Sequence, residues 1–201
     1  ICVKLNNQYN FINTNGQIIF DAWFDDCDDF INGFALVKLN GKYNLINTNG
    51  KLISDTWFDG CGDFYNGVAR VVFNNKLNLI NTNGKIISDT WFDEISNFKD
   101  GFALVELNGK SNFINTNGQI ISNTWFDGCG YFDNGVARVY LNYKWNYINT
   151  NGQLISDTWF DDCGIFINGF ACVRLNDKYN FINANGQLIS DTWFDACNKF
   201  N

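Results

Sequence analysis

Six tryptophans recur every 34 residues along this 201-residue chain, and their neighbours suggest a ligand site in each copy. Acids or their amide bracket each of them, as Asp55 and Asp59 bracket Trp57, and Asn123 is the only amide. An indole can stack on a sugar face while a carboxylate accepts the sugar hydroxyls, so a multivalent glycan-binding row is one interpretation. We favour the other, packing between repeats, because repeats keep their core positions most uniform. The row comprises Trp23, Trp57, Trp91, Trp125, Trp159 and Trp193.

Carboxylates are densest at Asp25, Asp26, Asp28 and Asp29. An acid/base pair needs unlike environments to separate its pKa values, and nothing distinguishes one repeat from the others in this way. Calcium loops of the D-x-D-x-D-G type have a spacing that these acids lack, so we predict a solvated acidic loop. The chain contains no histidine, which excludes Ser-His-Asp and Cys-His arrangements, and it has no phosphate-binding loop. We therefore expect no catalytic residues, no cofactor and no metal.

Cysteine recurs at two positions of the repeat. A cysteine that exchanges with isoleucine at a repeat position behaves as a small buried hydrophobe. The total of seven is odd, CxxC spacing is absent and no histidine is present, so we expect neither disulfides nor zinc. Unpaired thiols favour a reducing compartment, and we expect a cytoplasmic protein. One position holds Cys27, Cys61, Ile95, Cys129, Cys163 and Cys197, and the other holds Cys2, Leu36, Arg70, Leu104, Arg138 and Cys172.

The charge balance limits the classes of partner. The net charge is −7, and the 14 lysines and arginines are spread over the repeats rather than gathered in a stripe. Affinity for nucleic acid comes chiefly from clustered cations, so we expect no nucleic-acid partner. No apolar run approaches the 18 residues typical of a membrane span, and we expect no membrane association. The chain contains no methionine, which leaves open a leader removed during processing.

The whole chain is one 34-residue unit written six times. The unit at 34–67 reads FALVKLNGKYNLINTNGKLISDTWFDGCGDFYNG, and the first copy lacks only its leading residue. Because such units cannot bury their apolar faces alone, we predict a single repeat domain over residues 1–201 in which neighbouring copies cover one another. The predicted repeats are 1–33, 34–67, 68–101, 102–135, 136–169 and 170–201.

Each unit reads as an antiparallel β meander. Apolar residues alternate with Lys38 over 35–39, the period of two that indicates a half-buried strand. Asn40-Gly41 is typical of a two-residue hairpin turn, and 42–47 is the expected returning strand. A third strand is expected over 51–59, and a short fourth strand around 57–61 is an alternative. No window has the apolar spacing of a helix, so we predict an all-β fold of three-stranded, or alternatively four-stranded, meanders.

Two arrangements would let the meanders cover one another. A closed, propeller-like ring removes both free ends, whereas an open β-solenoid normally needs terminal repeats with a polar outer face. The outer copies resemble the inner ones, which favours the ring slightly; the solenoid is the alternative. A unit of 34 residues is short for a four-stranded blade, and an excerpt from a longer array would also lack caps.

The units resemble the WG repeat family, whose motif reads roughly K-W-G-Y-I-D followed by a glycine turn. The resemblance is carried by 144–149 (KWNYIN), by the aromatic-acidic segment 159–161 and by the linker 166–171. It covers all six copies and implies an all-β interaction module. Where the family has its eponymous glycine, this chain has Asn10, Asn44, Asn78, Asn112, Asn146 and Asn180.

Three functions fit such a repeated surface. The first is a non-enzymatic scaffold that binds a protein, the second is the glycan-binding row of tryptophans, and the third is a subunit that self-assembles into filaments. An asymmetric function should lie where the copies differ, so the candidate binding surface takes aromatic residues at the most variable position and outward arginines. It comprises Tyr9, Tyr43, Trp145, Tyr179, Arg70, Arg138 and Arg174.

Overall fold

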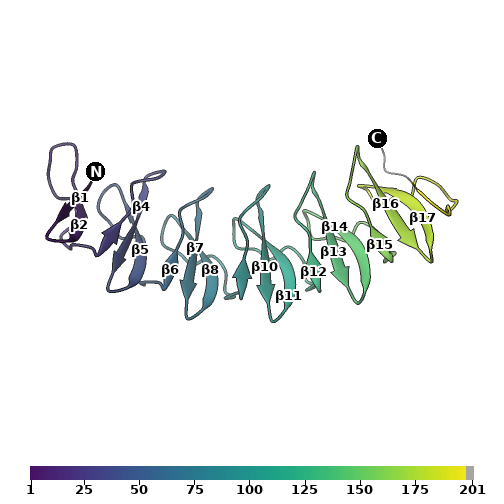
Figure 1. Ribbon diagram of the computed structural model, residues 1–201, viewed down its shortest axis with the longest axis horizontal. Helices are drawn as coiled ribbons and strands as arrows, with labels where there is room; N and C mark the ends of the chain where they lie inside the picture. Colours follow the sequence, from purple (N-terminus) through teal and green to yellow (C-terminus); the bar gives the residue numbers. More distant parts are fainter. Residues whose placement is uncertain (198–201) are drawn as a thin grey trace. The chain divides into compact units, whose positions relative to one another are not determined.

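The computed structural model describes residues 1–197, which form strands and turns without a helix, and hence without a helix able to cross a membrane (Figure 1). The all-β, tandem-repeat prediction is confirmed. The chain divides into two compact units. Unit 1 comprises residues 1–95 and 116–118, and unit 2 comprises residues 96–115 and those from 119 onward. The ring, the solenoid and the single domain stay predictions.

Unit 1 contains antiparallel sheets in chain order. The hairpin β1-β2 is followed by the three-stranded sheets β3-β4-β5 and β6-β7-β8, and the short strand β9 lies beyond them. The strands are β1 (Cys2–Leu5), β2 (Gln8–Phe11), β3 (Asp26–Cys27), β4 (Phe34–Leu39), β5 (Lys42–Asn47), β6 (Gly60–Cys61), β7 (Val68–Phe73), β8 (Lys76–Asn81) and β9 (Glu94–Ile95).

Unit 2 repeats the same pattern. It contains the hairpin β10-β11 and the three-stranded sheets β12-β13-β14 and β15-β16-β17. Its strands are β10 (Phe102–Leu107), β11 (Lys110–Asn115), β12 (Gly128–Cys129), β13 (Val136–Leu141), β14 (Lys144–Asn149), β15 (Asp162–Cys163), β16 (Phe170–Leu175) and β17 (Lys178–Asn183).

The hairpins form where the sequence predicts them. In β4-β5 the register pairs Phe34 with Asn47 and Leu39 with Lys42, so a two-residue turn closes the hairpin. Both turn residues have positive φ, 52° at Asn40 and 77° at Gly41, which is the geometry that matches the twist of paired strands.

The expected third strand over 51–59 is wrong. Only isolated bridges occur there, Leu52 with Ile46 and Phe58 with Tyr43, and the chain bends away between them. The following two residues, Gly60–Cys61, form β6, which pairs with β7 of the next repeat. The polar run 54–56 explains the difference, because its carbonyls bond a side chain instead of a neighbouring strand. Each three-stranded sheet therefore joins two successive repeats.

Both faces of a sheet are covered within each unit. Leu36 and Leu45 of sheet β3-β4-β5 contact Ala69, Val71 and Ile80 of sheet β6-β7-β8 in one cluster. Equivalent clusters join the first hairpin to the second repeat, and successive repeats of unit 2. The apolar surface of one repeat is thus removed from water by the next, which is the main favourable contribution to folding.

The prediction of unpaired cysteines is wrong for four of the seven. Disulfides join Cys2 to Cys27 and Cys172 to Cys197. The two cysteines of each pair are 25 residues apart, so no short cysteine motif in the sequence indicates the bridge. The other three cysteines, Cys61, Cys129 and Cys163, are free, as predicted.

Candidate binding surface

The asparagine of the motif is buried and supports the bend that follows it. Asn44 is 1% exposed, and its Nδ2 donates to the carbonyl oxygens of Ser54 at 2.8 Å and Thr56 at 3.1 Å. Its Oδ1 accepts the backbone amide of Leu45 at 2.8 Å. The same bonds recur in the other five repeats. A residue of this kind holds the structure and is not available to a ligand.

At least four of the predicted tryptophans lie at junctions between repeats. All six side chains are half-buried. Trp57 and Trp193 contact a phenylalanine of the preceding repeat, with ring centroids 6.5 Å from Phe24 and 6.4 Å from Phe160. Trp91 and Trp159 pack against the equivalent clusters. These contacts are those of junction packing, and part of each indole still faces solvent.

The aspartate after the Trp-Phe pair links two hairpin turns. Asp59 accepts a bond from the Lys42 ammonium of its own repeat and, at 2.8 Å, from the backbone amide of Asn74 in the next repeat. These two bonds, first the one from Lys42, hold the pKa of Asp59 below its ordinary value. The equivalent lysine pairs in the later repeats are Lys76 with Asp93, Lys110 with Asp127, Lys144 with Asp161 and Lys178 with Asp195.

The residues that differ between repeats share one cross-strand row on each sheet. In sheet β3-β4-β5 the register aligns Asp26, Lys38 and Tyr43, and aligned residues point to the same face. We name these sets the outer row. The others are Lys4 and Tyr9; Gly60, Val72 and Leu77; Glu106 and Ser111; Gly128, Tyr140 and Trp145; and Asp162, Arg174 and Tyr179.

The four predicted aromatic residues all lie in the outer row and are half-buried. Cations of their own sheets lie over three of the rings. The Lys4 ammonium is 4.7 Å from the centroid of Tyr9, and its Nζ donates to the Tyr9 hydroxyl at 3.0 Å. Lys38 lies 5.1 Å from the ring of Tyr43, and the Arg138 guanidinium lies 5.4 Å from that of Trp145. The rings are therefore held in fixed positions by their own sheets.

The three predicted arginines do not form one group. Arg70 and Arg138 lie two residues from the outer row on the same face of their strands, and their Nη1 atoms donate to the carbonyls of Ile95 at 2.8 Å and Cys163 at 3.0 Å. Arg174 belongs to the outer row and pairs with Asp177 at 3.1 Å. Two of the three thus bond the backbone near the end of their own repeats, while the third pairs with an acid three residues further along the chain.

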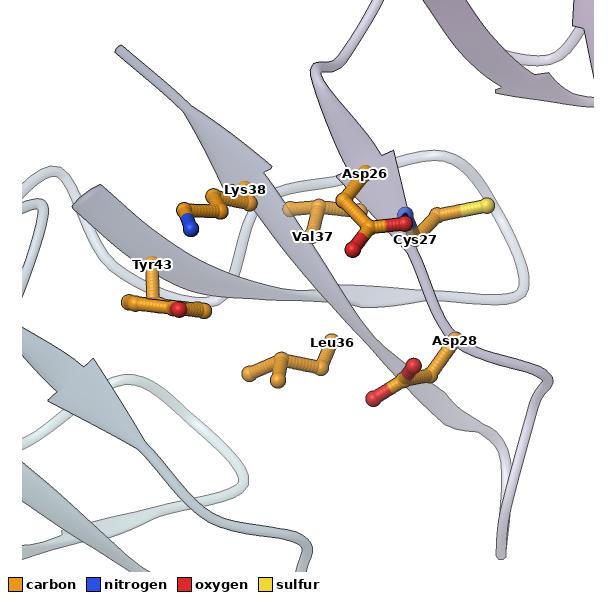
Figure 2. A pocket seen from close by; sticks show the side chains of 7 residues that line it. All are labelled: Asp26, Cys27, Asp28, Leu36, Val37, Lys38 and Tyr43. Carbon is orange, nitrogen blue, oxygen red and sulfur yellow. Dashed lines mark hydrogen bonds between the residues drawn. The ribbon is translucent and has the colours of Figure 1, made fainter. Parts of the chain in front are cut away.

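A groove of about 140 Å³ opens on the outer row of sheet β3-β4-β5 (Figure 2). Asp26, Asp28, Leu36, Lys38 and Tyr43 line it, together with Cys27 and Val37. Burial, and next the charges of Asp26, Asp63 and Asp29, raise the pKa of Asp28. Carboxylate, ammonium and aromatic groups thus adjoin one another, which suits a partner of mixed chemistry.

The acidic segment around this groove is partly used by the fold. Asp25 accepts the backbone amide of Asn40 at 2.6 Å, and Asp26 accepts that of Cys27 at 3.0 Å. Over residues 1–197 no three acidic, cysteine or histidine side chains lie where they could hold a metal ion.

Sequence reasoning placed Asp26 in a solvated acidic loop, not on the binding surface, and did not single out Asp162; both are acidic members of the outer row. Both lie on two-residue strands that become part of a sheet only through pairing with the next repeat. The alternation of residues over 35–39 indicates that Lys38 points outward, but no signal in the sequence places Asp26 beside it.

The fold defines a class, the all-β tandem-repeat proteins built from antiparallel hairpins. The chain belongs to the family described as WG containing repeat, because that family's model matches residues 11–43, 45–76, 79–110, 113–145 and 147–179. No curated protein matches the chain.

Several solved structures share part of its chain path. Hsv2 of Kluyveromyces lactis is 12% identical with a TM-score of 0.37, covering 79% of this chain and 58% of that one. A protein of unknown function from Bacteroides caccae is 15% identical with a TM-score of 0.30, covering 94% and 89%. AztD of Citrobacter koseri is 10% identical with a TM-score of 0.40, covering 92% and 66%. The chain thus spans less than two thirds of the length of Hsv2.

Proposed function

We propose that this protein is a non-enzymatic scaffold that binds a protein partner through its outer row. The observation that supports the proposal is that the constant positions of the repeat hold the fold, whereas the variable positions lie on its surface. The constant residues, such as Asn44, Phe58 and Asp59, are buried or bonded within the fold. The residues that vary in chemistry occupy the outer row, where they are half-buried or exposed. A partner therefore meets mainly the residues that differ from repeat to repeat.

The variation in the outer row favours a protein over a repeated glycan. The sheets β3-β4-β5 and β15-β16-β17 each present an acid, a cation and a tyrosine, such as Asp162, Arg174 and Tyr179. The fifth repeat presents Tyr140 and Trp145, with ring centroids 4.8 Å apart. A polymer of identical sugars would be matched by identical pockets, whereas a protein surface varies along its length. Tyrosine, tryptophan and arginine are also the residues enriched at the energetic centres of protein interfaces.

Photo-cross-linking tests this function directly. A photoreactive phenylalanine analogue placed at Tyr43 should give discrete adducts with one or a few proteins in a lysate of the source cells. The same analogue at the exposed Thr48, in the turn that follows the same hairpin, is the matched control and should give none. Tyr179 is a second test position. Equal adducts at Tyr43 and Thr48, or no adducts at either Tyr43 or Tyr179, would contradict the proposal. Concentration-dependent sedimentation of the pure chain would indicate self-assembly instead.

The glycan-binding alternative is favoured by one observation, the solvent-facing part of each tryptophan. It predicts dose-dependent signals on a glycan array that Trp57→Ala weakens while the free energy of unfolding is little changed. The scaffold proposal predicts no such signals, and it predicts that Trp57→Ala lowers stability because the indole packs against the core cluster that contains Phe24.

A further inference from the structure

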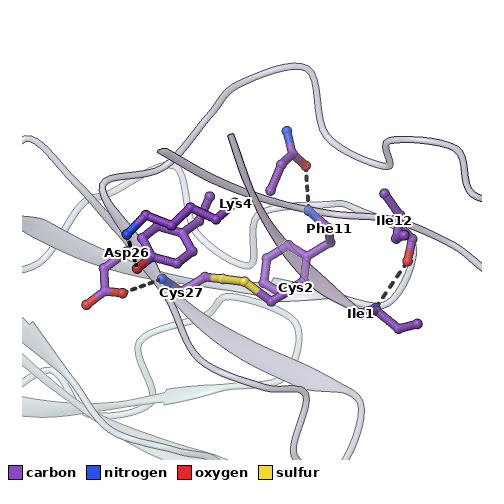
Figure 3. The surroundings of a disulfide bond; sticks show 9 residues. Ile1, Cys2, Lys4, Phe11, Ile12, Asp26 and Cys27 are labelled. Carbon is purple, nitrogen blue, oxygen red and sulfur yellow. Dashed lines mark hydrogen bonds between the residues drawn. A yellow bond between two sulfur atoms is a disulfide. The ribbon is translucent and has the colours of Figure 1, made fainter. Parts of the chain in front are cut away.

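Two positions of the repeat that are 25 residues apart lie close to each other in this chain. In the first repeat Cys2 belongs to β1 and Cys27 to β3, which is part of the next sheet (Figure 3). Their disulfide therefore joins two sheets that otherwise meet through apolar contacts. The amide of Cys27 donates to Asp26 at 3.0 Å, which holds the second cysteine in place.

The other repeats connect the same two positions by different chemistry. Leu36 and Leu104 lie in the same apolar clusters as Cys61 and Cys129, respectively. The arginines of the third and fifth repeats instead reach the carbonyls of Ile95 and Cys163. Cysteine stands at both positions only in the first and sixth repeats, and both of these pairs are bridged. The first position holds cysteine only in these two repeats, whereas the second holds cysteine in five of the six.

We propose that this pair of positions is a common contact that ties the end of a repeat to its first full strand, and that in the first and sixth repeats it acts as a redox-dependent lock. Formation of each lock removes two protons and two electrons from two thiols. A low-molecular-weight disulfide such as oxidised glutathione accepts them and becomes two thiols. Reduction by a dithiol reverses the step. The lock works where such oxidants prevail, which places the folded, locked form in an oxidising compartment.

The free cysteines explain why oxidation stops at two bridges. Cys61, Cys129 and Cys163 face leucine or arginine instead of a second cysteine. Burial, the largest cause, raises the pKa of each of these thiols to about 12, so little of the reactive thiolate is present at neutral pH. The two locks therefore form without competition from these three thiols.

Amide hydrogen exchange of the full chain tests the lock, with oxidised and reduced samples compared. Reduction should speed exchange by about a hundredfold in the segments 2–27 and 172–197, because a bridge closing a loop of this length restricts local opening to about that degree. Exchange in β7-β8, which has an arginine at the first of the two positions, should be unchanged. The matched control is Cys2→Leu with Cys172→Leu, which copies the residue of the second and fourth repeats. Its exchange should be the same under both conditions.

A gain-of-bridge variant provides an independent test. Leu104→Cys places a second cysteine opposite Cys129, and oxidised glutathione should then join the two, as peptide mapping under non-reducing conditions would show. The proposal is overturned if wild-type mapping shows Cys2 or Cys172 unpaired, or if exchange in their segments ignores reduction. It is also overturned if the thiol introduced by Leu104→Cys stays free while Cys2–Cys27 forms.

Discussion

Replacement of Gly84 by alanine is expected to lower the free energy of unfolding by about 4 kcal/mol or more. Gly84 has a φ of 83°, a conformation that costs an alanine about 1 kcal/mol. Gly84 also lies directly against the preceding repeat, because a Cβ atom at this position would overlap the carbonyl oxygen of Ile53. That oxygen belongs to the backbone and cannot move aside without separating the two repeats. Denaturant unfolding followed by fluorescence of the tryptophans measures the change.

Gly16 is the matched control for this substitution. It occupies the same position in the first repeat, with a φ of 76°, but a Cβ atom there would meet no atom within 4 Å. Gly16→Ala should therefore cost only the conformational term of about 1 kcal/mol. Equal losses for the two variants would contradict the close approach of neighbouring repeats at Gly84.

Replacement of Asn44 by alanine is expected to lower the free energy of unfolding by about 3 kcal/mol, because one buried and two part-buried backbone groups lose their partner. These groups are the carbonyls of Ser54 and Thr56 and the amide of Leu45. The bend at 54–56 should also loosen, which amide exchange around Thr56 would register.

Asn49 serves as the control for Asn44, because it lies in the same repeat and its side chain is exposed. Asn49→Ala should change the free energy of unfolding by less than about 0.5 kcal/mol, as surface substitutions usually do. If Asn44→Ala were equally mild, the buried asparagine would not be what supports the bend.

The sequence predicts the hairpins well because their signals are local. Alternating apolar residues and an Asn-Gly turn such as Asn40-Gly41 determine a hairpin with little help from other repeats. The third segment fails for the opposite reason. Its apolar residues Trp57 and Phe58 resemble a strand, but the side chain of Asn44 takes up the nearby carbonyls. That interaction is invisible until the hairpin and the bend are placed together.

The candidate site and the disulfides show the same limit. Variation between repeats identifies Tyr43 and Trp145, because a position free to vary can be recognised by comparing copies. Asp26 and Cys27 lie on β3, which forms only by pairing with β4 of the next repeat, and no signal within the first repeat indicates that pairing. Sequence reasoning therefore reaches within one repeat and stops at the junction between two.

The central claim is that contacts between successive repeats, rather than the hairpins alone, hold this fold. Residue-resolved amide exchange of the oxidised chain tests it most directly. The amide of Asp59 bonds the carbonyl of Val72 in the next repeat at 2.8 Å, so it should exchange as slowly as the amides within β7-β8. An Asp59 amide that exchanges freely while β7-β8 stays protected would mean that the repeats fold independently, and would contradict the account.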